Sequence, residues 1–224
     1  MEHDSSIRTY VRRSGHISNA QQRAYTALSA QYGIPFSQAQ LDFAAVFGNS
    51  SPVIIEIGFG MGTATVRIAQ SNPSINYLGI EVHKAGIGKL FLEIEKRSLH
   101  NVLCIEYDAV AVVEAMIPDG SAAGFHIFFP DPWPKKRHHK RRLVTRPFTD
   151  LLAAKLKGGG FIYMVTDWLD YAQWAYQELS STPCLCNAFD GFAPAQEWRP
   201  RTNFEERALA LGHGIQEIYF VKQP

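Results

Sequence analysis

Residues 53–62 form the sequence VIIEIGFGMG, a short apolar run followed by a glycine-rich turn. The first five of these residues are mostly β-branched and have the length of a buried strand. The run breaks at Gly58, Gly60 and Gly62, and residues 63–70 then carry apolar side chains that suit a helix. A strand, a glycine loop and a helix in this order predict the first unit of an α/β fold.

The same alternation of strands and helices continues to the end of the chain. It favours a mostly parallel sheet covered on both faces, in one α/β domain. We expect residues 1–35 to form a flexible basic N-terminal arm with a short helix, and residues 36–224 to form a single domain. Further strands are predicted over residues 76–80, 102–107, 124–129, 161–165 and 216–221, and helices over residues 20–32, 84–97, 109–116, 146–157, 169–179 and 203–211, with the glycines 158–160 ending the helix before them.

The composition is that of an ordinary soluble protein, with 46% hydrophobic and 19% charged residues among 224. Its net charge of +1 hides a local excess, because residues 135–142 contain six Lys/Arg and no acid, whereas the remaining 16 Lys/Arg face 21 Asp/Glu. The sequence has no apolar run of about 18 residues and no secretory signal pattern. We expect a cytoplasmic protein without a membrane span, whose three cysteines stay reduced.

The N-terminal residues 1–20 are polar, and only RTYVRR at residues 8–13 shows a pattern. Two interpretations stay open for this arm. It is either a solvated tail or a basic arm with one stacking aromatic that becomes ordered on nucleic acid.

An acid lies at or near the end of each of the five successive predicted strands. In an open α/β sheet, ligands bind beyond the carboxyl ends of the strands. An Asp at such a position can also simply cap the next helix, but five acids in this pattern favour a binding site. The five residues are Glu56, Glu81, Asp108, Asp131 and Asp167.

The glycine loop narrows the choice of ligand. A dinucleotide fingerprint has a third glycine at the position that Thr63 occupies here. Glu81, about 20 residues beyond the loop, suits a ribose diol and excludes a 2′-phosphate. The pattern indicates a nucleoside cofactor other than a nicotinamide dinucleotide.

Residues 126–142, HIFFPDPWPKKRHHKRR, join a predicted strand to a rigid acid–aromatic loop and a basic cluster. The prolines exclude a helix or strand interior. A basic cluster beside such a loop predicts a site that faces a phosphate-rich partner. The adjacent His138 and His139 lack a third ligand nearby, so no metal site is expected.

Five segments resemble one enzyme family. EIGFGMG, GIEVH, FPDPWPKKRHHKRR, TDW and RPRTNFEERALALGHGI are similar to the bacterial tRNA (guanine-N7)-methyltransferases, and the likeness extends over nearly the whole chain. The resemblance implies a Rossmann-like class I methyltransferase fold, with a seven-stranded, mostly parallel sheet, an antiparallel last strand and helices on both faces. It also implies methyl transfer from S-adenosyl-L-methionine, which becomes S-adenosyl-L-homocysteine, to N7 of the variable-loop guanine at position 46 of tRNA.

The resemblance further implies roles for individual residues. Asp131 matches the proposed catalytic acid, and one departure from the family pattern is His16, where an arginine is expected. The implied cofactor-binding residues are Glu56, Gly58, Gly60, Gly62, Glu81, Asp108 and Asp131. The implied substrate-binding residues are Lys135, Arg137, His138, His139, Lys140, Arg141, Arg142, Asp167, Thr202, Asn203, Phe204 and Glu205.

The implied chemistry needs little from the protein beyond positioning. Guanine N7 carries a lone pair and no proton, so no general base is required at the nucleophile. Catalysis should come from orientation and from carboxylates near the developing positive charge. We expect Asp131 to accept hydrogen bonds from the N–H edge of the guanine. Trp133 either stacks on the extruded base or is a packed loop aromatic.

The residues disfavour two other functions. A nicotinamide-dependent oxidoreductase is disfavoured by Thr63, and a tRNA-binding protein without activity is disfavoured by the intact acids Glu56, Glu81, Asp108 and Asp131. We expect no obligatory protein partner, and a monomer or a homodimer.

Overall fold

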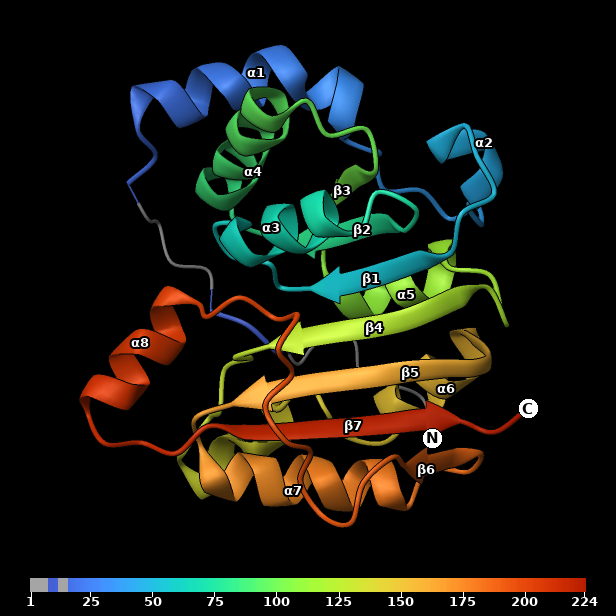
Figure 1. The fold of residues 1–224 in the computed structure, drawn as a ribbon, viewed down its shortest axis with the longest axis vertical. Coiled ribbons are helices and arrows are strands. Elements are labelled where there is room, and N and C mark those ends of the chain that lie inside the picture. Colours follow the sequence, from blue (N-terminus) through green and yellow to red (C-terminus); the bar gives the residue numbers. More distant parts are fainter. Residues whose placement is uncertain (1–7, 12–15) are drawn as a thin grey trace.

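A computed structural model describes residues 8–11 and 16–224. They form a seven-stranded sheet in the order β3-β2-β1-β4-β5-β7-β6 (Figure 1). Neighbouring strands from β3 to β5 are parallel, whereas β7 is antiparallel to both β5 and β6. The predicted sheet, with an antiparallel last strand, is therefore confirmed. The strands are β1 (Val53–Ile57), β2 (Asn76–Glu81), β3 (Val102–Glu106), β4 (Ala122–Phe128), β5 (Leu156–Thr166), β6 (Leu185–Asn187) and β7 (Gln216–Lys222).

Helices cover both faces of the sheet, as predicted. One apolar cluster joins the strands to α5, α6 and α7 through buried residues such as Val113, Phe148 and Tyr171. The second joins them to α1, α3 and α4 through residues such as Ala24 and Phe91. The helices are α1 (Asn19–Tyr32), α2 (Phe43–Phe47), α3 (Thr63–Ser71), α4 (Lys84–Arg97), α5 (Ala109–Met116), α6 (Phe148–Lys155), α7 (Leu169–Ser180) and α8 (Asn203–Ala210), with a 3-10 turn η1 (Lys136–Arg141).

Helix α1 packs into the domain. A Cβ atom on Gly88 of α4 would lie 2.3 Å from the carbonyl oxygen of Gln21, so only glycine permits this approach of the two helices. Beyond α1, the amide of Ile34 donates to the carbonyl oxygen of Cys104 in β3 at 2.8 Å. The helix that the sequence grouped with the arm is thus attached to the sheet. The predicted flexibility of the arm stays a prediction, and its residues 1–7 and 12–15 lie outside the described residues.

The glycines 158–160 do not end a helix. Helix α6 already ends at Lys155, and β5 starts at Leu156, which is paired with Ala122 of β4. Between that pair and the pair of Gly124 with Phe161 the register shifts, so the glycines form a bulge inside β5. The sequence also gave no signal for β6, since only Leu185 of its three residues is buried.

The carboxyl ends of β1 to β5 meet at one edge of the sheet. Figure 1 shows α8 beyond the arrowheads of β4 and β5, at this same edge. Loops carrying the predicted site residues leave the strands here. Within the described ranges, no helix has the length and apolar character needed to cross a bilayer.

Candidate active site

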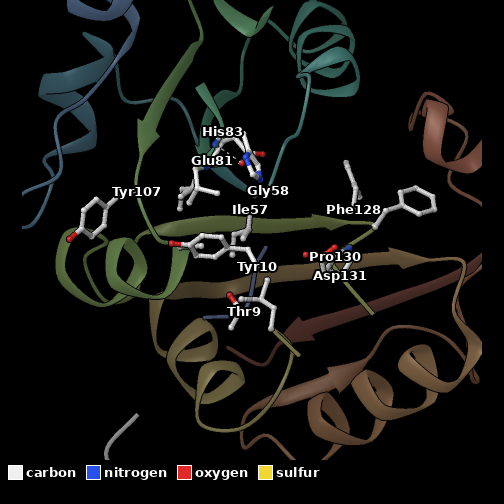
Figure 2. Close-up of a pocket in the computed structure, with 15 residues that line it drawn as sticks. Thr9, Tyr10, Ile57, Gly58, Glu81, His83, Tyr107, Phe128, Pro130 and Asp131 are labelled. Atoms are coloured by element: carbon white, nitrogen blue, oxygen red, sulfur yellow. Dashed lines mark hydrogen bonds between the residues drawn. The ribbon is translucent and has the colours of Figure 1, made fainter. Parts of the chain in front are cut away.

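A pocket lies beyond the carboxyl ends of β1, β2 and β4. Gly58, Glu81 and Asp131 line it, together with His83 and Tyr107 (Figure 2). Two residues of the N-terminal segment, Thr9 and Tyr10, complete the wall. The edge predicted from the strand-end acids therefore does carry a pocket, and two of those five acids line it.

The glycine loop at the end of β1 is fixed by the acid at the end of β2. Glu81 is buried, and its Oε2 accepts a hydrogen bond from the amide of Gly60 at 2.8 Å. Its Oε1 accepts from the amides of Val82 and His83 at 2.7 and 3.1 Å. A carboxylate has about four lone-pair sites, so Glu81 retains capacity for a ligand while it holds the loop in place.

Two glycines of the loop have different physical reasons. Gly60 has φ 58°, and no atom lies within 4 Å of the place of a Cβ, so the loop leaves open space there. Gly62 has φ 68° at the start of α3, and a Cβ would lie 2.6 Å from Cδ1 of Leu90. Glycine suits position 60 because of its positive φ. At position 62 it suits both the positive φ and the close packing against Leu90.

Glu56 does not line the pocket. It is only 2% exposed, and its Oε2 has no hydrogen-bond partner within the described chain. Glu56 is paired with Gly79 of β2, two residues before Glu81, so Glu56 and Glu81 lie on the same face of the sheet, and Ile57 lies on the other. Burial raises the pKa of Glu56 to about 7. Its implied contact with the cofactor stays a prediction.

Asp108 lies between two pocket residues, Tyr107 and Ala109, but is not itself part of the lining. It is the N-cap of α5, and its side chain accepts from the amide of Ala111 at 3.0 Å. Capping is therefore one function of this acid, and its contact with the cofactor stays a prediction.

The loop after β4 presents Asp131 to the pocket. Asp131 is exposed, whereas Trp133 is half-buried. Phe129 and Trp133 hold left-handed φ values of 51° and 47°, which are unfavourable for bulky residues and bend the chain sharply. The indole Nε1 of Trp133 donates to the carbonyl oxygen of Thr9 at 3.0 Å, and Arg141 lies over the ring at 4.8 Å. Trp133 is thus packed in the loop and not free to stack on a base.

The basic cluster divides into exposed and buried members. Lys135, Arg137 and Lys140 are exposed beside the Asp131 loop, as a phosphate-binding surface requires. The His138 ring packs edge-on against Trp133, and the His139 ring packs edge-on against Trp174.

Arg142 corrects the sequence prediction. It is 1% exposed, and its guanidinium donates to Asp170 and, at 3.1 Å, to the carbonyl oxygen of Pro132. The bond from Arg142 lowers the pKa of Asp170. Because Arg142 is enclosed between its own loop and α7, it holds the loop in place, and its buried side chain is not available for the predicted RNA contact.

The segment TNFE starts α8. The hydroxyl of Thr202 accepts from the amide of Glu205 at 3.2 Å, as an N-cap does. Asn203 and Phe204 are exposed, and the Phe204 ring lies 6.3 Å from that of Phe129, which lines the pocket. Asn203 and Phe204 are therefore accessible to a substrate at this edge.

Glu205 is buried and engaged by Arg199, which the sequence analysis missed. The Arg199 guanidinium contacts Glu205 in α8, Glu217 in β7 and the hydroxyl of Tyr163 in β5. The spacing Thr-x-x-Glu is that of a capping box, but the Glu205 carboxylate accepts from Arg199 instead. Its substrate contact stays a prediction.

Asp167, after β5, lies 3.5 Å from Nδ1 of His213, and both side chains are partly exposed. It does not line the pocket. Its substrate contact stays a prediction. In residues 8–11 and 16–224 no group of three or more His, Cys, Asp or Glu side chains is arranged to hold a metal ion.

Solved structures with a similar fold define the class of protein. A 16S rRNA methyltransferase, KamB, superposes with a TM-score of 0.58 at 15% identity, over 95% of this chain and 97% of its own. A 16S rRNA (adenine(1408)-N(1))-methyltransferase from Catenulisporales acidiphilia gives 0.54 at 14% identity, over 83% and 93%. At such low identity the likeness concerns the fold, which is that of the class I methyltransferases.

Sequence comparison gives the family. A family model described as "Putative methyltransferase" matches residues 50–218. The tRNA (guanine-N(7)-)-methyltransferase of Nitrosospira multiformis is 48% identical over 97% of this chain and 95% of its own length. That of Neisseria meningitidis serogroup A is 49% identical over 98% and 92%. The chain belongs to the tRNA (guanine-N(7)-)-methyltransferase family.

Proposed function

We propose that the protein transfers a methyl group from S-adenosyl-L-methionine to N7 of the variable-loop guanine at position 46 of tRNA. One observation carries the proposal beyond family membership. Glu81, suited to a ribose, and Asp131, suited to a guanine edge, line the same pocket, and exposed Lys135, Arg137 and Lys140 follow directly on the Asp131 loop. A cofactor site, a base site and a phosphate-binding surface are thus contiguous.

The pocket suits a nucleoside cofactor. Gly58 and Gly60 leave open space where side chains would stand, so a ligand can approach the backbone of the loop. Glu81 would hold the ribose hydroxyls with its remaining lone pairs. Tyr107 and Ala109 offer an apolar surface at the end of β3, suited to an adenine. When bound, the cofactor supplies a methyl group activated by a sulfonium.

Asp131 would position the second reactant. The guanine N7 lone pair needs no deprotonation, so the protein has to align the ring and offset the positive charge that develops on it. An exposed carboxylate at the pocket rim can accept hydrogen bonds from the N–H edge of the guanine. Phe204, 63% exposed beside Phe129, replaces Trp133 as the aromatic available to the extruded base.

The exposed cations would bind the tRNA backbone. Phosphate contacts supply affinity and register. His138 and Arg141 pack on Trp133, so they can orient the loop as well as contact RNA. The enzyme would be cytoplasmic and would act as a monomer or a homodimer without an obligatory protein partner.

Mapping the methylated nucleotide tests the function. Unmodified tRNA is incubated with the protein and S-adenosyl-L-methionine, and 7-methylguanosine is located by cleavage at the modified base. We expect one modified guanine, at position 46. A tRNA with adenine at this position is the matched control and should accept no methyl group. Methylation at another nucleotide, or none with the wild-type protein, contradicts the proposal.

A further inference from the structure

The N-terminal segment of residues 8–11 lies against the pocket. Thr9 and Tyr10 are half-buried, whereas their neighbours Arg8 and Val11 are exposed. Thr9 and Tyr10 line the pocket opposite residues of β1 and β2, such as Ile57. In the view of Figure 2, the Tyr10 ring lies between Tyr107 and Asp131. Because the pocket is bounded by the strand ends and by this segment, a ligand that fills the pocket touches both.

Trp133 holds the segment in this place. Its indole N–H donates to the carbonyl oxygen of Thr9 at 3.0 Å, between residues 124 positions apart in the sequence. A half-buried indole N–H normally needs such a partner. Trp133 is itself fixed, because Arg141 lies over its ring at 4.8 Å and His138 packs against it edge-on at 5.9 Å. The segment is therefore anchored to the loop that carries Asp131.

We propose that Thr9 and Tyr10 are the outer wall of the cofactor pocket, with Tyr10 in contact with the bound cofactor and the bond from Trp133 to Thr9 holding the wall in place. The inference deepens the proposed function and rests on it. The strand ends contribute the carboxylate of Glu81 and apolar side chains such as Ile57, and the Tyr10 ring adds a further large apolar surface to the pocket. Such a lining suits a nucleoside, because apolar side chains cover its ring faces and polar groups bind its hydroxyls.

Binding of S-adenosyl-L-homocysteine to the full chain, measured calorimetrically without RNA, tests the wall. Tyr10→Ala removes the ring and should weaken binding by about tenfold, whereas Tyr10→Phe keeps the ring and should stay within about twofold. Trp133→Phe removes the N–H donor and part of the ring from a residue outside the pocket lining, and should weaken binding by about fivefold. Arg8→Ala and Val11→Ala change exposed neighbours in the same segment and should bind like the wild type.

The outcomes separate the two proposals. If the wild type does not bind S-adenosyl-L-homocysteine, both the proposed function and the wall fall. If the wild type binds but Tyr10→Ala binds equally well or more tightly, only the wall falls, and the segment lies over the pocket without contacting the cofactor. Thermal unfolding of each variant identifies a general loss of structure; a Tyr10→Ala protein that unfolds like the wild type and binds weakly supports the wall.

Discussion

Arg199 donates two hydrogen bonds to Glu205, of 2.6 and 3.1 Å, and both side chains are buried. A third bond of 2.8 Å joins Arg199 to the buried Glu217 of β7. This one guanidinium fixes the first turn of α8 to the sheet. The exposed Asn203 and Phe204 precede Glu205 in that turn, so their positions at the edge of the site depend on Arg199.

Replacing Arg199 by methionine should destabilise the fold strongly. The change leaves Glu205 and Glu217 buried without their cation, which costs about 3–5 kcal/mol for a broken buried pair. Urea unfolding measures the loss. Arg201→Met alters an exposed arginine two residues away and should change the free energy of unfolding by less than about 0.5 kcal/mol. Adding Glu205→Gln and Glu217→Gln to Arg199→Met should recover part of the stability; a single variant as stable as the wild type would refute the buried network.

Much of the fold follows from local patterns in the sequence. Helices α4 and α5 begin and end where their apolar spacing and Asp108 predict. The edge that carries the site follows from the parallel strands, because all their carboxyl ends meet there. The face on which Glu56 lies can also be predicted from the sequence, since alternation along β1 places Glu56 and Ile57 on opposite faces.

The rest of the site depends on contacts between distant segments. Nothing local distinguishes Arg142 from Arg141, yet only Arg142 meets Asp170, 28 residues away, and is buried. The contact of Trp133 with Thr9 likewise has no local signature. Basic composition therefore predicted the phosphate-binding surface as a whole, but not which of its cations support the protein.

Neutralising Arg137 and Lys140 should weaken tRNA binding without affecting the fold. Both are exposed beside the Asp131 loop. The logarithm of the affinity falls as the logarithm of the salt concentration rises. Each lost phosphate contact makes this slope shallower by about 0.7–0.9. Filter binding of tRNA to Arg137→Gln/Lys140→Gln across a salt series measures this slope. Lys96→Gln, an exposed change in the last turn of α4, is the control. A slope equal to that of the wild type would exclude both residues from the RNA contacts.

Asp131→Ala should abolish methyl transfer while the affinity for S-adenosyl-L-homocysteine stays within a few-fold of the wild type. The carboxylate lies at the exposed rim of the pocket, so its removal deprives the guanine of its orienting acceptor and leaves the loop around Glu81 intact. Single-turnover methylation and calorimetry measure the two effects. Asp190→Ala, an exposed acid that follows β6, should be fully active. Wild-type turnover by the Asp131 variant would contradict the role of Asp131 in orienting the guanine.

The buried Glu56 should make stability depend on pH. Its pKa is raised to about 7 in the folded protein, from an ordinary value of 4.5. Between these values the folded state holds a proton that the unfolded state has lost, so the free energy of unfolding falls as pH rises and levels off above the folded pKa. From about pH 5.5 to about pH 8 the loss is about 2 kcal/mol.

Comparison with Glu56→Gln isolates this contribution. Glutamine keeps the shape and stays neutral, so the variant should gain about 2 kcal/mol relative to the wild type over the same rise in pH. Burial lowers the pKa of His126 to about 3. This produces the opposite slope below its ordinary pKa, but His126 is present in both proteins and cancels in the difference. Urea unfolding at several pH values gives that difference directly. A constant difference would mean that Glu56 is ionised in the fold, with a cationic or hydrogen-bonding partner beside its carboxylate.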